Sequence, residues 1–180
     1  MQFSNTSIPD LYVITVDLLK DERGFFARTF CSNEFADLGL ESNFVQSNIS
    51  FNNVKGTLRG MHLQGAPHQE VKLVRCTKGS IYDVAVDYRQ ESPTYLQWFG
   101  VELNEDNRKM FYIPKGFAHG YVTLTDESEV SYLVSEFYTP GCEQGLRWND
   151  PSIGIDWPVS DEQSLCVSDK DKAWPLLGGR

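Results

Sequence analysis

Turn residues interrupt this chain at short, regular intervals, and that spacing most constrains its fold. Breaks such as Asn52-Asn53, Lys78-Gly79 and Pro114-Lys115-Gly116 separate short apolar segments. Eight such segments occupy residues 44–51, 57–64, 70–77, 80–87, 95–103, 109–114, 118–124 and 128–137. This pattern predicts an antiparallel, all-β sandwich or jelly-roll barrel. It excludes a parallel, doubly wound sheet, because no helical stretches lie between the segments.

The flanking regions predict additions to this barrel within one domain spanning residues 1–180. Residues 11–20 are rich in β-branched and aromatic side chains, and a turn at 21–24 leads into 25–30, so a hairpin is expected. Ser32 is expected to cap a short helix that carries Phe35 and Leu38 and ends at Gly39. The tail from Gly145 onward, which contains three tryptophans, is expected to fold over the barrel.

Charge and cysteine content narrow the class of protein. Sixteen basic residues against 25 acidic ones give a net charge of −9, which disfavours nonspecific binding to nucleic acid. The four cysteines form no Cys-x-x-Cys pair, so we expect reduced thiols. No apolar run is long enough to cross a bilayer, and the first residues lack the features of a signal peptide, so we expect a cytoplasmic protein.

Polar residues suited to chemistry are concentrated in residues 56–72. His62 in this stretch has three readings: a proton carrier, a metal ligand or a structural hydrogen-bonding group. Strand alternation points Arg59 and His62 to opposite faces. If both serve one site, the strand needs a bulge or a twist, and Gly60 between them is the residue type that permits one.

Two further residues can each be interpreted in two ways. Alternation places Tyr132 beside Val130 and Val134, so it is expected to point into the barrel, either toward a ligand or as a core tyrosine with a backbone partner. His119 follows a tight turn in an expected loop, where it is either a ligand contact or a group that orients the loop. Metal-binding barrels of the cupin type often use a His-x-His pair, which this chain lacks, so no metal site is predicted.

Several motifs, taken in order, resemble the dTDP-4-dehydrorhamnose 3,5-epimerase family. They are residues 56–64 (GTLRGMHLQ), 72–76 (KLVRC), 82–87 (YDVAVD), 92–95 (SPTY), 113–120 (IPKGFAHG) and 148–158 (WNDPSIGIDWP). The resemblance covers nearly the whole chain. It implies a homodimeric cupin barrel that epimerises a nucleotide-linked 4-keto-6-deoxyhexose without a cofactor or a metal.

The resemblance also implies catalytic roles. His62 is expected to be the base, Tyr132 the acid on the opposite face of the sugar, and Lys72 the group that stabilises the enolate oxygen. The carboxylate that orients His62 is matched to Asp171 in Ser168-Asp169-Lys170-Asp171, with Asp169 as the alternative. Whether carbon 3, carbon 5 or both are inverted stays open.

For substrate binding, the family pattern points to a set of side chains spread along the chain. Arg23, Arg59 and His119 are expected at the diphosphate, Lys170 and Glu143 as further contacts, and Tyr138 stacked on the base. The remaining candidates are Gln46, Asn48 and Arg28.

Two departures from the family pattern each remove a carboxylate. Arg28 stands where a glutamate is usual, and Gln46-Ser47-Asn48 replaces Gln-Asp-Asn. An arginine suits the acceptors on cytosine better than the N–H of thymine, so a CDP-linked sugar is one hypothesis. The alternative is that Arg28 is a surface exchange turned away from the base.

Two functions of other classes are alternatives to the epimerase. One is a metal-dependent cupin oxygenase or isomerase, which the missing His-x-His pair argues against. The other is a sugar-nucleotide-binding module without catalysis, which would bind ligand but exchange no protons.

Overall fold

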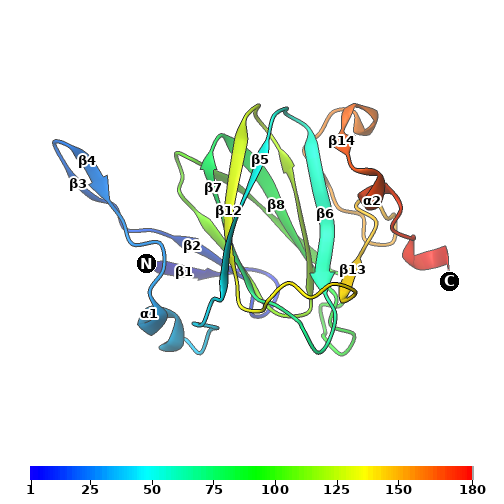
Figure 1. The fold of residues 1–180 in the computed structure, drawn as a ribbon, viewed down its shortest axis with the longest axis horizontal. Helices are drawn as coiled ribbons and strands as arrows, with labels where there is room; N and C mark the ends of the chain where they lie inside the picture. Colours follow the sequence, from blue (N-terminus) through cyan, green and yellow to red (C-terminus); the bar gives the residue numbers. More distant parts are fainter. Residues whose placement is uncertain (180) are drawn as a thin grey trace.

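The computed structural model describes residues 1–179 and consists mainly of two antiparallel sheets packed face to face (Figure 1). The first sheet has the order β1 (Gln2–Asn5), β2 (Tyr12–Thr15), β10 (Met110–Ile113), β7 (Lys72–Lys78), β12 (Ser128–Val134) and β5 (Gln46–Asn52). The second has the order β13 (Glu143–Gly145), β6 (Thr57–Gln64), β11 (Phe117–Thr123), β8 (Ser80–Asp87) and β9 (Trp98–Asn104), and β14 (Cys166–Val167) pairs in parallel with β6. The predicted all-β, cupin-type barrel with short peripheral helices is confirmed.

Three apolar clusters hold these layers together. Between the sheets, Val74, Phe111 and Val130 belong to a cluster of buried side chains from both sheets. A second cluster covers the outer face of the second sheet, where Trp148 and Trp157 from the C-terminal tail pack as predicted. This tail, orange and red in Figure 1, also carries η1 (Glu162–Ser164), α2 (Asp169–Lys172) and η2 (Leu177–Gly179).

The third cluster lies under α1 (Ser32–Ala36), on the outer face of the first sheet. Phe35 is fully buried there and makes edge-to-face contacts with Phe3, Phe30 and Phe44. Burying such a ring contributes roughly 2–3 kcal/mol. The predicted cap was wrong by one residue, because Cys31 is the N-cap and makes no side-chain hydrogen bond there. The helix also ends earlier than predicted, at Ala36, so Leu38 lies outside it, and Gly39 follows at φ +70°.

The predicted single strand over residues 11–20 was also wrong. β2 ends at Thr15, and β3 (Leu19–Asp21) then pairs only with β4 (Gly24–Phe26). The chain therefore leaves the first sheet after β2 and forms a separate hairpin, which extends away from the barrel on the left of Figure 1. The hairpin itself was predicted correctly, but the sequence did not predict that it would be separate from the barrel.

The cysteine prediction is confirmed, since all four are free thiols. Burial raises the pKa of the Cys76 thiol to about 12, so this thiol is unreactive. Within residues 1–179, no helix has the length and apolar character needed to span a membrane.

Candidate active site

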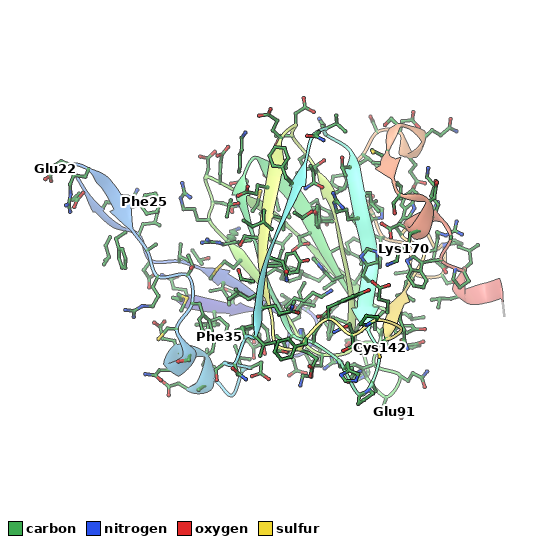
Figure 2. All side chains as sticks on the ribbon, in the orientation of Figure 1. Glu22, Phe25, Phe35, Glu91, Cys142 and Lys170 are labelled. Carbon is green, nitrogen blue, oxygen red and sulfur yellow. The ribbon has the colours of Figure 1, made fainter. Side chains whose placement is uncertain are left out.

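Two adjoining cavities open between β6 and β12, one of about 500 Å³ and one of about 400 Å³. Both are lined by His62, Lys72, Tyr132 and Lys170. Three of these side chains come from strands of the two facing sheets, and Lys170 reaches the cavities from the C-terminal segment beside β6 (Figure 2). Three of the four residues predicted to be catalytic therefore line both cavities, and the fourth, Asp171, lines the larger one.

His62 forms a close pair with Asp171. Its Nε2 atom lies 2.6 Å from Asp171 Oδ1, and the other carboxylate oxygen accepts a hydrogen bond from the Gly60 N–H at 3.3 Å. Asp171 is buried, whereas the alternative partner, Asp169, is exposed. Burial opposes ionisation of Asp171 and is the largest single effect, but the hydrogen bond and charge of His62, together with hydrogen bonds from Gly60 and Ser168, outweigh it and lower the pKa of the carboxyl below its ordinary value.

The C-terminal segment positions this carboxylate. β14 pairs in parallel with the first residues of β6, and the chain then enters α2. The Ser168 hydroxyl caps α2 by accepting a hydrogen bond from the Asp171 N–H at 3.1 Å. Strand pairing and cap together bring Asp171 to the side of β6 that carries His62.

The expected bulge between Arg59 and His62 is present. His119 on β11 is the register partner of His62 and Tyr121 that of Arg59, so two residues of β6 oppose one residue of β11. Gly60, at φ +138°, occupies this bulge, and a Cβ on it would lie 2.5 Å from the Gly120 Cα. Because of the bulge, Arg59 and His62 line the same cavity, the larger one.

Tyr132 projects from the facing sheet and lines both cavities. Burial raises the pKa of its hydroxyl, which is therefore protonated at neutral pH. Within residues 1–179 this hydroxyl has no hydrogen-bond partner, unlike that of Tyr121, which donates to Ser50 Oγ at 2.9 Å. The reading of Tyr132 as a core tyrosine with a backbone partner is not supported.

Lys72 lines both cavities and is held in place by two contacts. Its Nζ lies 3.2 Å from Glu70 Oε1 and 3.5 Å from the His62 carbonyl oxygen, and only 12% of its side chain is exposed. From the sequence, Glu70 was considered only as a metal ligand with His62 and His68, which the spacing disfavoured, and not as a partner of Lys72. Its position two residues before Lys72 on the chain was the one available signal.

His119 lies in strand β11 rather than in the expected loop, because β11 begins at Phe117. Its Nε2 is 2.6 Å from Oδ1 of Asp83, a fully buried carboxylate on β8. Asp83 was missed by sequence reasoning. The signal was an acidic residue in the middle of a largely apolar strand, on the face that alternation turns inward.

The smaller cavity collects most other predicted ligand contacts: Gln46, Asn48, Tyr138, Glu143 and Lys170. Lys170 Nζ is 2.8 Å from Glu143 Oε2, and this pairing lowers the pKa of the Glu143 carboxyl. Gln46 Oε1 accepts a hydrogen bond from the Tyr138 N–H at 3.0 Å. The Tyr138 side chain is 57% exposed, so its ring is free to contact a ligand.

Two predicted contacts, Arg23 and Arg28, do not reach either cavity. Arg23 lies in the projecting hairpin, is 83% exposed and pairs with Asp21. Arg28 is 60% exposed, and its Nη1 lies 3.5 Å from Glu34 Oε1. Within one chain, Arg23 therefore lies apart from Arg59 and His119, because the hairpin pairs only with itself, and its contact with the diphosphate stays a prediction. Among residues 1–179, no group of three or more His, Cys, Asp or Glu side chains is arranged to hold a metal ion.

Comparison with known proteins gives one consistent result. Residues 5–178 match the family model for dTDP-4-dehydrorhamnose 3,5-epimerase. An epimerase of that name from Methanothermobacter thermautotrophicus is 46% identical over 98% of this chain and 94% of its own length.

Solved structures agree. The epimerase from Elizabethkingia anophelis superimposes with a TM-score of 0.95 at 39% identity, covering 99% of this chain and 97% of its own. The one from Legionella pneumophila, in complex with dTDP-4-keto-L-rhamnose, has a TM-score of 0.91 at 40% identity, covering 98% of this chain and 93% of its own. The resemblance seen in the motifs is thus confirmed, and this chain belongs to the dTDP-4-dehydrorhamnose 3,5-epimerase family.

Proposed function

We propose that this protein is an isomerase that epimerises a dTDP-linked 4-keto-6-deoxyhexose through an enolate. The observation that carries the proposal is the arrangement at the cavity junction. The His62–Asp171 pair approaches from the second sheet and the Tyr132 hydroxyl from the first, so a sugar ring between them has a proton acceptor on one face and a donor on the other.

The chemistry follows from the acidity of hydrogens next to a ketone. His62 takes the proton from the carbon, and the electron pair left behind spreads onto the ketone oxygen. Asp171 stabilises the imidazolium that forms. Lys72 donates to the enolate oxygen, where one aimed donor is typically worth about 3 kcal/mol. Tyr132 returns a proton from the opposite face and inverts the carbon, and proton exchange with solvent restores both groups.

The two cavities together suit a long, anionic ligand. Arg59, His119 and Lys170 supply positive or donating groups, while Tyr138 offers an exposed ring for a base. The related enzyme from Legionella pneumophila binds dTDP-4-keto-L-rhamnose. Since Arg28 pairs with Glu34 outside both cavities, no group among residues 1–179 of one chain favours cytosine, and dTDP is the proposed nucleotide.

Incubation in D₂O with dTDP- and CDP-linked 4-keto-6-deoxyglucose tests this function directly. We expect deuterium to enter carbon 3, carbon 5 or both of the dTDP sugar, and the labelled positions identify which carbons are inverted. His62→Gln is expected to abolish uptake, while His68→Gln, a histidine lining neither cavity, is the matched control. Faster turnover of the CDP sugar would refute the proposed nucleotide, and binding without deuterium uptake would indicate a module without catalysis.

We also propose that the protein is a homodimer. β5 is an edge strand of the first sheet and exposes Ile49 and Phe51, and the projecting hairpin exposes Leu19 and Phe26. Exposed apolar side chains on a free strand edge are typical of contact surfaces. Light scattering should give twice the mass of the chain, and Ile49→Asp should reduce it. A wild-type protein that stays monomeric at micromolar concentration would contradict this.

A further inference from the structure

His119, which lines the larger cavity, forms a second histidine–carboxylate pair that the proposed proton transfers do not use. His119 Nε2 lies 2.6 Å from Asp83 Oδ1, and His119 faces His62 directly across the β6–β11 ladder. The two pairs differ in burial of the imidazole: the His62 side chain is 40% exposed, whereas that of His119 is 11% exposed. His119 is therefore the better shielded from solvent.

Asp83 is poorly compensated for a buried carboxylate. It is 0% exposed, and its second oxygen, Oδ2, has no hydrogen-bond partner among the described residues. The nearby Tyr121 hydroxyl donates to Ser50, and no lysine or arginine forms an ion pair with Asp83 within residues 1–179. An ionised carboxylate in such a place is costly unless a cation pairs with it. His119 is the group in position to supply that charge.

We infer that Asp83 is a positioning residue that keeps His119 as an imidazolium, with its Nδ1–H held ready for an anionic oxygen of the nucleotide sugar. With Nε2–H donated to Asp83, a neutral imidazole would present Nδ1 as an acceptor only. A charged imidazole presents a second donor instead. The inference rests on the proposed function, which supplies the anionic ligand.

Such a pair would act differently from His62 and Asp171. The base must lose and regain its proton in each turnover, whereas an imidazolium locked by a buried carboxylate acts as a fixed, preorganised charge. Its partner is either an oxygen of the diphosphate or the enolate oxygen. Both are anionic, and the two are separable by experiment.

Other charged or titratable groups surround His119 and enter any measurement of its protonation. They are Arg59 and His62 on β6, Lys72 on β7, Tyr121 on β11, Tyr132 on β12, and Lys170 and Asp171 from the C-terminal segment. The cations in this set oppose a charge on His119, so Asp83 must offset them. Removing the Asp83 charge should therefore change the protonation of His119 strongly.

The test is ¹⁵N NMR of the full chain labelled at histidine, together with binding of dTDP. The chain has three histidines, so His62→Gln, His68→Gln and His119→Gln assign the signals. In the free wild type at neutral pH, we expect both ring nitrogens of His119 to be protonated. In Asp83→Asn, whose amide keeps the size of the side chain, we expect a neutral His119 ring.

Functional readouts identify the anionic oxygen. If the donor serves the diphosphate, the dissociation constant of dTDP should rise by about tenfold or more in Asp83→Asn. The difference between variant and wild type should become smaller at acidic pH, where the His119 ring takes up a proton. Unchanged dTDP binding with slower deuterium exchange at saturating substrate assigns the donor to the enolate. Asp87→Asn, which removes another fully buried carboxylate from β8, is the control and should leave the His119 signals unchanged.

Three results would overturn the inference. One is a wild-type His119 that carries a single ring proton at neutral pH, which is decisive even if Asp83→Asn fails to fold. The second is an Asp83→Asn variant with unchanged His119 protonation, and the third is a changed protonation with neither binding nor exchange affected. Wild-type deuterium uptake is measured separately, so failure of the proposed function is distinguishable from failure of this inference.

Discussion

Nε2 of His62 lies 2.6 Å from Oδ1 of Asp171, although 109 positions separate the two residues in the chain. The pairing of β14 with β6 and the Ser168 cap of α2 bring them together. The proposed base is thus oriented by a segment outside the main strand order of both sheets.

Asp171→Asn tests whether the charge of this carboxylate matters. The amide still accepts a hydrogen bond but does not stabilise an imidazolium, so we expect turnover to fall by about 10²- to 10⁴-fold with little change in dTDP binding. Asp169→Asn, two residues away and exposed, should behave as wild type in the same assay. Equal losses in the two variants would argue against a specific role for Asp171.

Tyr132→Phe separates proton removal from proton return. Since burial raises the pKa of Tyr132, the hydroxyl is a proton donor at neutral pH, and its loss should slow inversion by about 10²-fold or more. Deuterium exchange without inversion should persist, because His62 still removes and returns a proton on its own face. Tyr112→Phe, whose hydroxyl accepts from the Glu41 N–H in a different part of the barrel, is the control. Full inversion in Tyr132→Phe would show that another acid operates.

Gly60→Ala tests the bulge. A methyl group there meets the Gly120 backbone at 2.5 Å and also requires an L residue at φ +138°, so we expect the free energy of unfolding to drop by roughly 2–4 kcal/mol. Gly24→Ala is closely matched, since Gly24 has φ +132° but no neighbour within 4 Å of the added carbon. Its free energy of unfolding should fall by a smaller amount, which reflects the unfavourable φ angle alone. Urea unfolding of both variants gives the comparison, and similar losses would mean that the close approach is unimportant.

Asp87 makes a pH-dependent contribution to stability. Burial opposes its ionisation, but hydrogen bonds from Arg89, Ser92 and Thr94 outweigh burial and lower its pKa from 3.8 to about 2. The pKa of Asp87 is lower in the folded state than in the unfolded state, so its ionisation stabilises the fold by about 2 kcal/mol. This stabilisation is complete above the pKa of the unfolded state and is lost as the pH falls through the pKa of the folded state.

Urea unfolding between about pH 6 and pH 2 measures this contribution. The wild type should lose about 2 kcal/mol more across that range than Asp87→Asn, in which the carboxylate is absent. Parallel stability curves for the two proteins would show that the pKa of Asp87 is the same in the folded and unfolded states.

Local patterns in the sequence accounted for much of the fold. Turn residues and alternation predicted the barrel strands from β5 to β12, and Gly60 was recognised as the one place where β6 had to bulge. These features depend on neighbours a few residues apart, which the sequence displays directly. The catalytic roles expected of His62 and Tyr132 came instead from the resemblance to the epimerase family, because local patterns left the role of each residue open.

What the tertiary structure decided involves contacts between distant segments. Sequence reasoning left Asp169 and Asp171 as alternatives and passed over Asp83, and the family pattern suggested that Arg23 joins Arg59. Folding buries Asp171 and Asp83 and, within one chain, leaves Arg23 on a separate hairpin. The physical reason is that burial and hydrogen-bond partners depend on which strands become neighbours. The sequence therefore determined which groups this protein possesses, and the packing of β14 and α2 against β6, and of β8 against β11, decided which of them act together.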